Sequence, residues 1–220
     1  MISFAKIFSV IFHPVFILLY SFCFYFQIDH QQNYLNTNPS LFISLFIFIF
    51  IMGVVFPLIS MLIMYRSKTI SSLSIPIRKE RLPILFLVLI YYSMIYYVFW
   101  NWNNQWANSL ELYLSFLFGG IITLFLATII TLKWKISLHS IAISGFSGGM
   151  LGALSETIGD WSYVYNIEEM MIYNTILLFL IGLIASSRLI LNSHTPKQVL
   201  AGTALGFTIE LICVLQHIHI

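Results

Sequence analysis

The chain contains seven apolar stretches of membrane-spanning length, with little polar sequence between them. They comprise residues 7–26, 41–64, 83–100, 110–132, 139–157, 170–185 and 197–215. About 20 consecutive apolar residues cross the hydrocarbon core as a helix, which satisfies its own backbone hydrogen bonds. This pattern predicts an all-α fold, a polytopic transmembrane helical bundle with six or seven spans. No repeat or separate polar region interrupts the pattern, so residues 1–220 are expected to form a single integral membrane domain.

Composition excludes several other classes of protein. Only 8% of the residues are charged, whereas a soluble domain of this length carries about 25%. The net charge of +2 gives no sign of nucleic-acid binding. The chain has no P-loop, CxxC pair or HExxH motif, so the sequence predicts neither a metal site nor a cofactor. Membrane lipids are therefore the expected partners, and nothing indicates an oligomeric state.

Basic residues are distributed asymmetrically over the predicted bundle. All ten Lys and Arg fall on one side, and the opposite connections carry acidic residues and no base. The positive-inside rule then places the basic side in the cytoplasm. Four of the ten, namely Arg78, Arg81, Lys135 and Arg188, are also candidates for binding an anion. Without them six bases remain against none, so the predicted orientation is unchanged.

The stretch with the most chemical content is residues 186–202, SSRLILNSHTPKQVLAG. Arg188 ends an apolar run, His194 follows six residues later, and Pro196 suits the first turn of another helix. Gln198 lies four residues after His194, so the two share a face if the helix includes both. Polar groups at a membrane edge are costly unless they bind something. An arginine fork suits a phosphate, and a histidine can attack one or carry its proton.

This stretch resembles the third signature of the type 2 phosphatidic acid phosphatase superfamily, S-R-x-x-x-x-x-H-x-x-x-D. Ser187, Arg188 and His194 match it in type and spacing. The following run, PKQVLAG, is similar to the family's usual P-x-D-V-x-A-G. The departure is Gln198, which stands where the family has aspartate.

Two other polar stretches resemble the remaining family signatures more weakly. Arg81 stands close to a proline, as the arginine of the first signature does, and Arg78 lies about one helical turn before it. The second signature, P-S-G-H, is represented by Ser137 and His139, with apolar residues in place of the proline and the glycine. Lys135 lies four residues before His139.

The resemblance implies a metal-independent phosphoric monoester or diphosphate hydrolase that acts on a lipid phosphate or an isoprenyl diphosphate. In the family's scheme His194 attacks phosphorus and becomes a phosphohistidine, and His139 protonates the leaving oxygen. Gln198 takes the position of the aspartate that holds the nucleophile. The residues expected to bind the phosphate are Arg188, Arg81, Lys135, Arg78 and Ser137.

A second interpretation stays open because Gln198 supplies a hydrogen bond but no charge. The chain would then be a non-catalytic membrane protein of the same fold that binds a phosphate-bearing lipid. The expected location in either case is a bacterial inner membrane. The charge asymmetry places the site at the cytoplasmic face, whereas many bacterial members of the family act at the outer face.

Counting spans predicts where the three polar stretches lie. Two spans separate Arg81 from His139, and two more separate His139 from His194. An even number of spans returns the chain to the same face, so the three stretches are expected to converge there.

Three further features lie outside these signatures. His13 precedes a proline inside the first apolar stretch, which predicts a kink. Glycines at small-x-x-x-small spacing within residues 145–152 predict close helix packing of the fifth stretch. Glu210 lies deep in the seventh stretch, where a carboxyl is costly, so it is expected to have a polar partner or to lie near the far interface.

Overall fold

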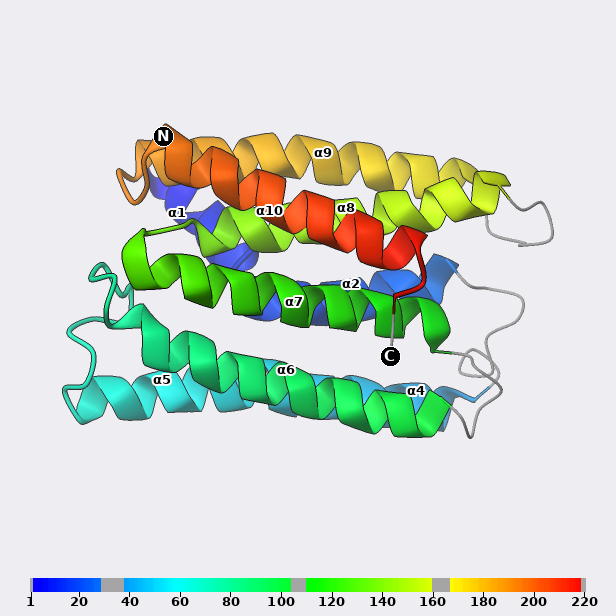
Figure 1. Cartoon of the computed structure of the whole chain (residues 1–220), viewed down its shortest axis with the longest axis horizontal. Coiled ribbons are helices and arrows are strands. Elements are labelled where there is room, and N and C mark those ends of the chain that lie inside the picture. The colour runs from blue at the N-terminus through cyan, green and yellow to red at the C-terminus, as the bar shows by residue number, and fades with distance from the viewer. Residues whose placement is uncertain (1, 29–37, 104–109, 160–166, 219–220) are drawn as a thin grey trace.

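The computed structural model describes residues 2–28, 38–103, 110–159 and 167–218, which form helices and no strand. The helices are α1 (Ile2–Ile11), α2 (Pro14–Ile28), α4 (Pro39–Ile49), η1 (Phe50–Val55), α5 (Phe56–Arg66), α6 (Arg81–Asn103), α7 (Glu111–Lys133), α8 (Leu138–Gly159), α9 (Ile167–Ile190) and α10 (Pro196–Leu215). Most of them run along the long axis of the molecule (Figure 1). The predicted all-α bundle is confirmed.

The helices account for the predicted spans. Within the described residues, five helices are long and apolar enough to cross a membrane, or six if the bent pair α1–α2 counts as one span. One of the five is the continuous helix Pro39–Arg66, built from α4, η1 and α5. Helix α8 is not among them. It has 22 residues, but Ser and Gly make up much of its sequence, and it packs inside the bundle against α10, α9 and α2.

Proline residues explain the two irregular helices. Pro14 opens α2, and the axis of α2 is bent by 56° from that of α1, so the kink predicted at His13 is confirmed as a break. Pro57 follows the π-helical segment η1. Because proline lacks an N–H and crowds the carbonyl four residues earlier, the helix widens locally. Gly53 in η1 leaves room for Leu18, whose Cδ2 lies 2.9 Å from where a Cβ would stand.

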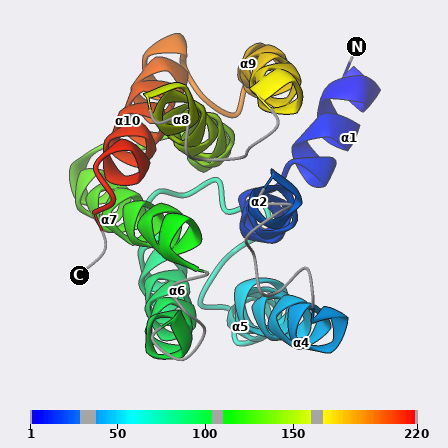
Figure 2. The same cartoon turned by 90° about the vertical axis from the view of Figure 1, so that its right-hand side faces the viewer.

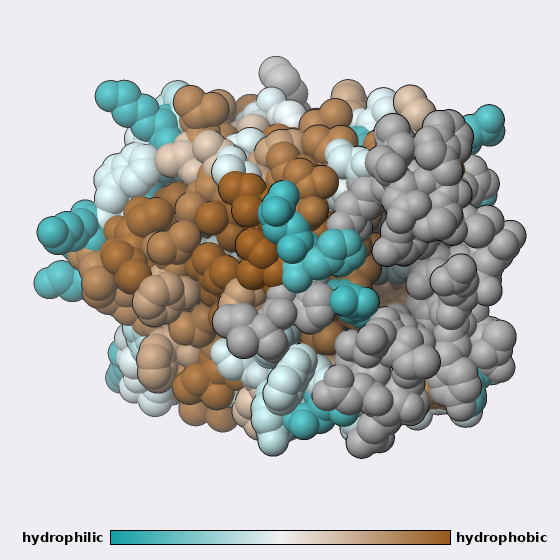
Figure 3. Space-filling model, turned by 45° about the vertical axis from the view of Figure 1, so that its right-hand side comes forward, coloured by the Kyte–Doolittle hydropathy of each residue, from teal (hydrophilic) through white to brown (hydrophobic). Residues whose placement is uncertain are grey.

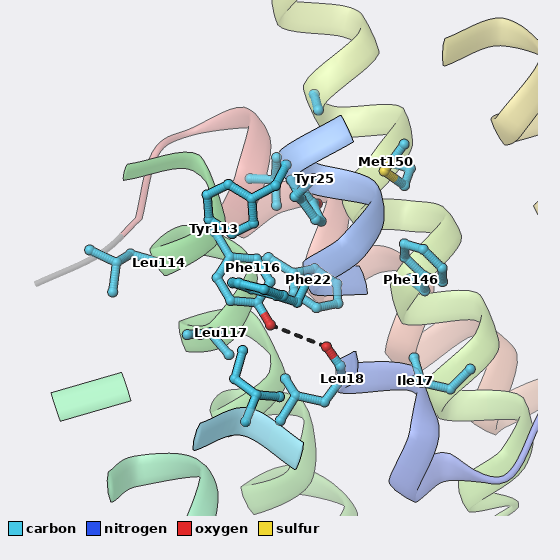
Figure 4. Packing of buried hydrophobic residues seen from close by; sticks show 14 of the residues in the cluster. Ile17, Leu18, Phe22, Tyr25, Tyr113, Leu114, Phe116, Leu117, Phe146 and Met150 are labelled. Atoms are coloured by element: carbon cyan, nitrogen blue, oxygen red, sulfur yellow. Dashed lines mark hydrogen bonds between the residues drawn. The ribbon is translucent and has the colours of Figure 1, made fainter. Parts of the chain in front are cut away.

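Aromatic side chains dominate the core around α2, which lies between the α8–α9 and α4–α5 sides of the bundle (Figure 2). Phe22, Tyr25, Tyr113, Phe116 and Phe146 are buried together (Figure 4). The hydroxyl of Tyr113 donates to the backbone carbonyl of residue 18 over 3.2 Å. This cluster ties α2 to α7 and α8, so the chain after the α1–α2 break has a fixed position in the bundle.

The closest helix contact joins α8 and α10. A Cβ at Gly148 would overlap the carbonyl of Phe207, and a Cβ at Gly206 would overlap that of Ile141. The two backbones can approach this closely only because both positions are glycine. The close packing predicted for residues 145–152 is therefore confirmed.

The outer surface is that of an integral membrane protein. Large apolar side chains point outward on several helices, as Phe179 (70% exposed) and Leu200 (71% exposed) do on α9 and α10. Figure 3 shows a broad hydrophobic band on one face of the molecule. A contiguous apolar surface of this kind is stable against lipid rather than water.

Candidate functional site

Hydrogen bonds join the three polar stretches at one end of the bundle. Arg81, at the start of α6, donates through Nη1 to the carbonyl of Ile136 at 3.2 Å. Lys135 donates through Nζ to the carbonyl of Ser193 at 3.0 Å. The backbone N–H of residue 137 bonds the carbonyl of Gln198 at 3.4 Å. The convergence expected from the even numbers of spans is therefore observed.

The start of α10 orients His194. Thr195 is the N-cap, Pro196 opens the helix, and Gln198 closes a capping box. The Gln198 Oε1 accepts the backbone N–H of Thr195 at 3.3 Å and lies 3.0 Å from Nδ1 of His194. A backbone N–H only donates, so the amide oxygen must be the atom that faces both groups. The proton of neutral His194 therefore sits on Nδ1, and Nε2 keeps its lone pair.

His194 is held in its neutral form. The residue is 8% exposed, and this burial is the main cause that lowers the pKa of His194 to about 4. The hydrogen bond to Gln198 raises that pKa, and the charges of Arg81, Lys135 and Arg188 lower it further. The pKa of Lys135 is also lowered, first by burial and then by the two arginines. Three cations thus lie around an uncharged imidazole.

Arg188 and His139 are both tied to Ser9 of α1. Arg188 donates through Nη1 to the Ser9 hydroxyl at 3.3 Å, and its buried Nε has no partner among the described residues. The His139 Nε2 lies 3.0 Å from the Ser9 carbonyl oxygen. A carbonyl only accepts, so Nε2 of His139 carries a proton and Nδ1 is free to act on a ligand.

The break between α1 and α2 brings His13 to the same place. The rings of His13 and His139 meet edge to face, with centroids 5.1 Å apart. Sequence reasoning assigned His13 only a kink and assigned Ser9 nothing. His13 before a proline was the one signal, because a helix break exposes backbone and side chains that an unbroken span would turn toward lipid.

These residues share a cavity of about 400 Å³ that extends into the bundle. Ser9, His13, Arg81, His139, Arg188 and His194 form the polar end of this cavity, and Tyr92, Thr123 and Glu210 are polar groups elsewhere in its lining. The remaining walls are mostly apolar and come from α2, α5, α6, α7 and α8; they include Leu18, Leu58, Leu85, Val88 and Leu117. A cavity of this form suits a molecule with an anionic head and an apolar chain.

The segment between α5 and α6 covers part of this cavity. Leu73, Ser74 and Ile75 belong to its lining. The carbonyl of Ile75 accepts a hydrogen bond from Nε of Arg81 at 3.1 Å, although the φ of Ile75 is 43°. β-Branched residues rarely adopt that conformation, so surrounding contacts must hold it. The carboxylate of Glu80 accepts from the backbone and hydroxyl of Ser71.

Three of the residues expected to bind phosphate lie behind the cavity rather than on its wall. Arg78 donates through Nη1 to the carbonyls of Thr131, at 2.9 Å, and Leu132, and so caps the end of α7. The Ser137 hydroxyl accepts from the N–H and hydroxyl of Ser140 and caps α8. Lys135 contributes charge from its position against the turn between α9 and α10, where it binds the carbonyl of Ser193. Arg81 and Arg188 are therefore the arginines placed to touch a ligand.

Residues 145–149 also read G-x-S-x-G, the pattern of a hydrolase nucleophile elbow. They lie in the middle of α8, whereas an elbow needs a sharp turn between a strand and a helix. Ser147 is buried, and its hydroxyl has no partner among the described residues. Ser147 is also not among the residues that line the cavity at the histidines' end of the bundle.

Comparison with family models, curated proteins and solved structures finds no match to this chain.

Proposed function

We propose that the protein is an integral membrane phosphatase that hydrolyses a lipid phosphate or diphosphate through a phosphohistidine at His194. The observation that carries the proposal is a buried, neutral His194 whose Nδ1–H is held by Gln198. Its Nε2 lone pair is then available beside Arg81 and Arg188 at the polar end of an apolar cavity. The basic end of the bundle, and with it the site, would face the cytoplasm of a bacterial inner membrane.

In the proposed reaction, two histidines carry out bond formation and proton transfer, and two arginines bind the phosphoryl oxygens. Nε2 of His194 forms a bond to phosphorus while the bond from phosphorus to the lipid oxygen breaks. Because Nε2–H of His139 is bound to the Ser9 carbonyl, His139 protonates that oxygen only as an imidazolium with a second proton on Nδ1; it gives up this proton and becomes neutral. Water then attacks the phosphohistidine, returns the electron pair to Nε2 and gives its proton to Nδ1 of His139. The fixed guanidinium groups of Arg81 and Arg188 stabilise the charge on the equatorial oxygens.

Gln198 supports a second candidate, a lipid-phosphate binder without turnover. The amide fixes the tautomer of His194 but supplies no negative charge to stabilise the imidazolium-like intermediate. In a serine-protease triad, exchanging the aspartate for its amide lowers kcat by about 10⁴-fold. The arginines and the cavity would still hold the ligand.

Phosphate release by the purified protein in detergent tests both candidates. The substrates are phosphatidate, phosphatidylglycerol phosphate and an isoprenyl diphosphate, each with and without a chelator. Wild type is expected to release phosphate in both conditions, and His194→Ala to abolish release because no nucleophile remains. His217→Ala, which changes an exposed histidine after α10, is the control that should keep the wild-type rate.

The outcomes separate the candidates. A wild-type rate that survives His194→Ala would reject the catalytic assignment. No release by wild type, together with phosphatidate binding that Arg188→Ala weakens, would support the binder. No release and no phosphate-dependent binding would reject both.

A further inference from the structure

A buried carboxyl group lies inside the membrane part of the cavity, away from the histidines. Glu210 of α10 is 4% exposed and belongs to the cavity lining. Its Oε2 has no hydrogen-bond partner among the described residues. The polar partner expected from the sequence is therefore missing for this oxygen. Ionisable groups at such depth are costly and usually serve a function.

The space around this carboxyl is shaped by glycines from two other helices. A Cβ at Gly119 of α7 would overlap Oε2 of Glu210, and a Cβ at Gly145 of α8 would lie 3.0 Å from its Cγ. At Gly120 the corresponding distance to Oε1 is 3.5 Å. Any larger residue at Gly119 would displace the carboxyl group. The three helices thus leave a place for this side chain next to the cavity.

A hydroxyl group without a partner among the described residues accompanies the carboxyl group of Glu210. Thr123 lies one helical turn along α7 from Gly119 and Gly120, is 4% exposed and also lines the cavity. Its Oγ1 has no partner among the described residues. Two buried polar groups therefore face the same apolar cavity with hydrogen-bonding capacity unused, which costs free energy unless a ligand completes it.

The distance from the phosphate end limits what that ligand is. Gly145, which touches Glu210, lies six residues beyond His139 on α8, and six residues of helix rise about 9 Å. Apolar side chains such as Leu85 and Val88 supply most of the remaining wall. A molecule that reaches both ends carries a phosphate, an apolar segment and one hydrogen-bonding group on its chain.

We propose that Glu210 and Thr123 select lipid phosphates whose chain carries a hydroxyl group about 9 Å from the phosphate; the choice of a phosphate lipid rests on the proposed function. No described cation contacts Glu210, so a neutral donor is its natural partner. A hydroxyl donates to the carboxyl oxygen and accepts from the threonine. It also enters an apolar cavity at much lower cost than an ammonium or a metal ion does.

Matched lipids test this selection by competition binding to the purified protein in detergent. The pair is phosphatidate with plain acyl chains and phosphatidate with 3-hydroxyacyl chains; a second pair is the two corresponding diacylglycerols. Wild type is expected to prefer the hydroxylated phosphatidate about tenfold, the size of one net hydrogen bond. Glu210→Leu should lose this preference, whereas Glu210→Gln, which keeps an acceptor oxygen, should retain most of it.

Two results would overturn the proposal: equal binding of the two phosphatidates by wild type, or a preference that survives Glu210→Leu. Thermal unfolding of the ligand-free variants checks folding. If Glu210→Leu fails to fold, Thr123→Val takes its place and should reduce the preference. Preference for the hydroxyl in both lipid pairs without any effect of phosphate would uphold this site and reject the phosphatase. Phosphate-dependent binding without hydroxyl preference would reject this site and leave the phosphate site in place.

Discussion

At the scale of single residues, the orientation of one amide decides which nitrogen of His194 can react. The sequence predicted the pair of His194 and Gln198 on the condition that one helix includes both. The two side chains do form a hydrogen bond at 3.0 Å, but His194 lies outside α10, before its N-cap Thr195, so the pairing comes from the geometry of the helix start rather than from a shared helical face. The orientation follows from Thr195, whose N–H binds the same oxygen. Thr195 and Gln198 have the spacing of a capping box, so the sequence carried this signal too.

Under the proposed phosphohistidine mechanism, Gln198→Glu should raise turnover and move the acid limb of the pH–rate profile. Glutamate keeps the length of the side chain and the capping box, and it adds a negative charge beside His194. That charge raises the pKa of His194 above about 4 and stabilises its phosphorylated form. Nε2 must be unprotonated to attack, so activity is present above this pKa and lost below it. We expect the acid limb to move up by about one pH unit.

Gln198→Ala is the matched control. The substitution removes the hydrogen bond that holds Nδ1 of His194 and one hydrogen bond of the capping box. Turnover should therefore fall, and the acid limb of the pH–rate profile should not move to higher pH. An unmoved acid limb in Gln198→Glu would show that position 198 does not act on His194, the proposed nucleophile.

The same lowered pKa predicts how stability depends on pH. As pH falls from 6.5 toward 4, the unfolded chain binds a proton at His194 that the folded chain does not. Folding should therefore lose stability over this range in wild type. His194→Asn, which takes up no proton, should reduce the loss in thermal unfolding measured at pH 4 and pH 7. An equal loss in both proteins would contradict the prediction.

Ser9, His13 and Glu210 show the limit of prediction from residue patterns. Ser9 and His13 reach the site only because the α1–α2 break turns them toward His139. A lone polar residue in an apolar run does not say which helices will surround it. The depth of Glu210 was visible in the sequence, but the glycines that surround it come from α7 and α8.

At the scale of helices, the contact between α8 and α10 positions both histidines. His139 is near the start of α8 and His194 lies two residues before α10, so the backbone contacts through Gly206 and Gly148 limit how far apart the two rings can move. Spacing of small residues made close packing of α8 predictable. It did not identify α10 as the partner, because every neighbouring span is equally apolar.

Gly206→Ala should destabilise the protein by about 1–3 kcal/mol, because the added methyl overlaps the carbonyl of Ile141 and forces α8 and α10 apart. Thermal unfolding in detergent measures the effect, and turnover should fall with it as the histidines separate. Gly182→Ala is the control: nothing lies within 4 Å of its added Cβ. That change should be neutral or stabilise α9 by up to about 1 kcal/mol. Equal effects of the two substitutions would contradict the assigned contact.

At the scale of the whole molecule, the count of the spans follows from hydrophobicity, and the convergence of the polar stretches at one end follows from that count. Five or six apolar spans and the more polar α8 correspond to the seven predicted stretches. The helix ends and connections at one end hold Arg66, Lys68, Lys79 and Lys133, in addition to the cations of the site. Part of the predicted opposite side, residues 29–37, 104–109 and 160–166, lies outside the described residues.

Labelling of single cysteines in intact cells should show the basic end inside. Ser40 and Lys68 are exposed and stand at opposite ends of the continuous helix Pro39–Arg66. In a background with Cys23 and Cys213 replaced by alanine, an impermeant thiol reagent should modify Ser40→Cys and spare Lys68→Cys until the cells are opened. The reason is that bases near the ends of spans are retained in the cytoplasm.

The reverse labelling pattern would have a direct consequence for the site, because Lys68 and the Arg81 end of α6 belong to the same side of the bundle. It would place His139 and His194 at the outer face, where a lipid phosphate reaches them from the outer leaflet. The positive charges of that end would then be retained against the usual bias in order to bind an anion. Removing Arg81 and Arg188 together should in that case leave the labelling unchanged while phosphatidate binding is lost.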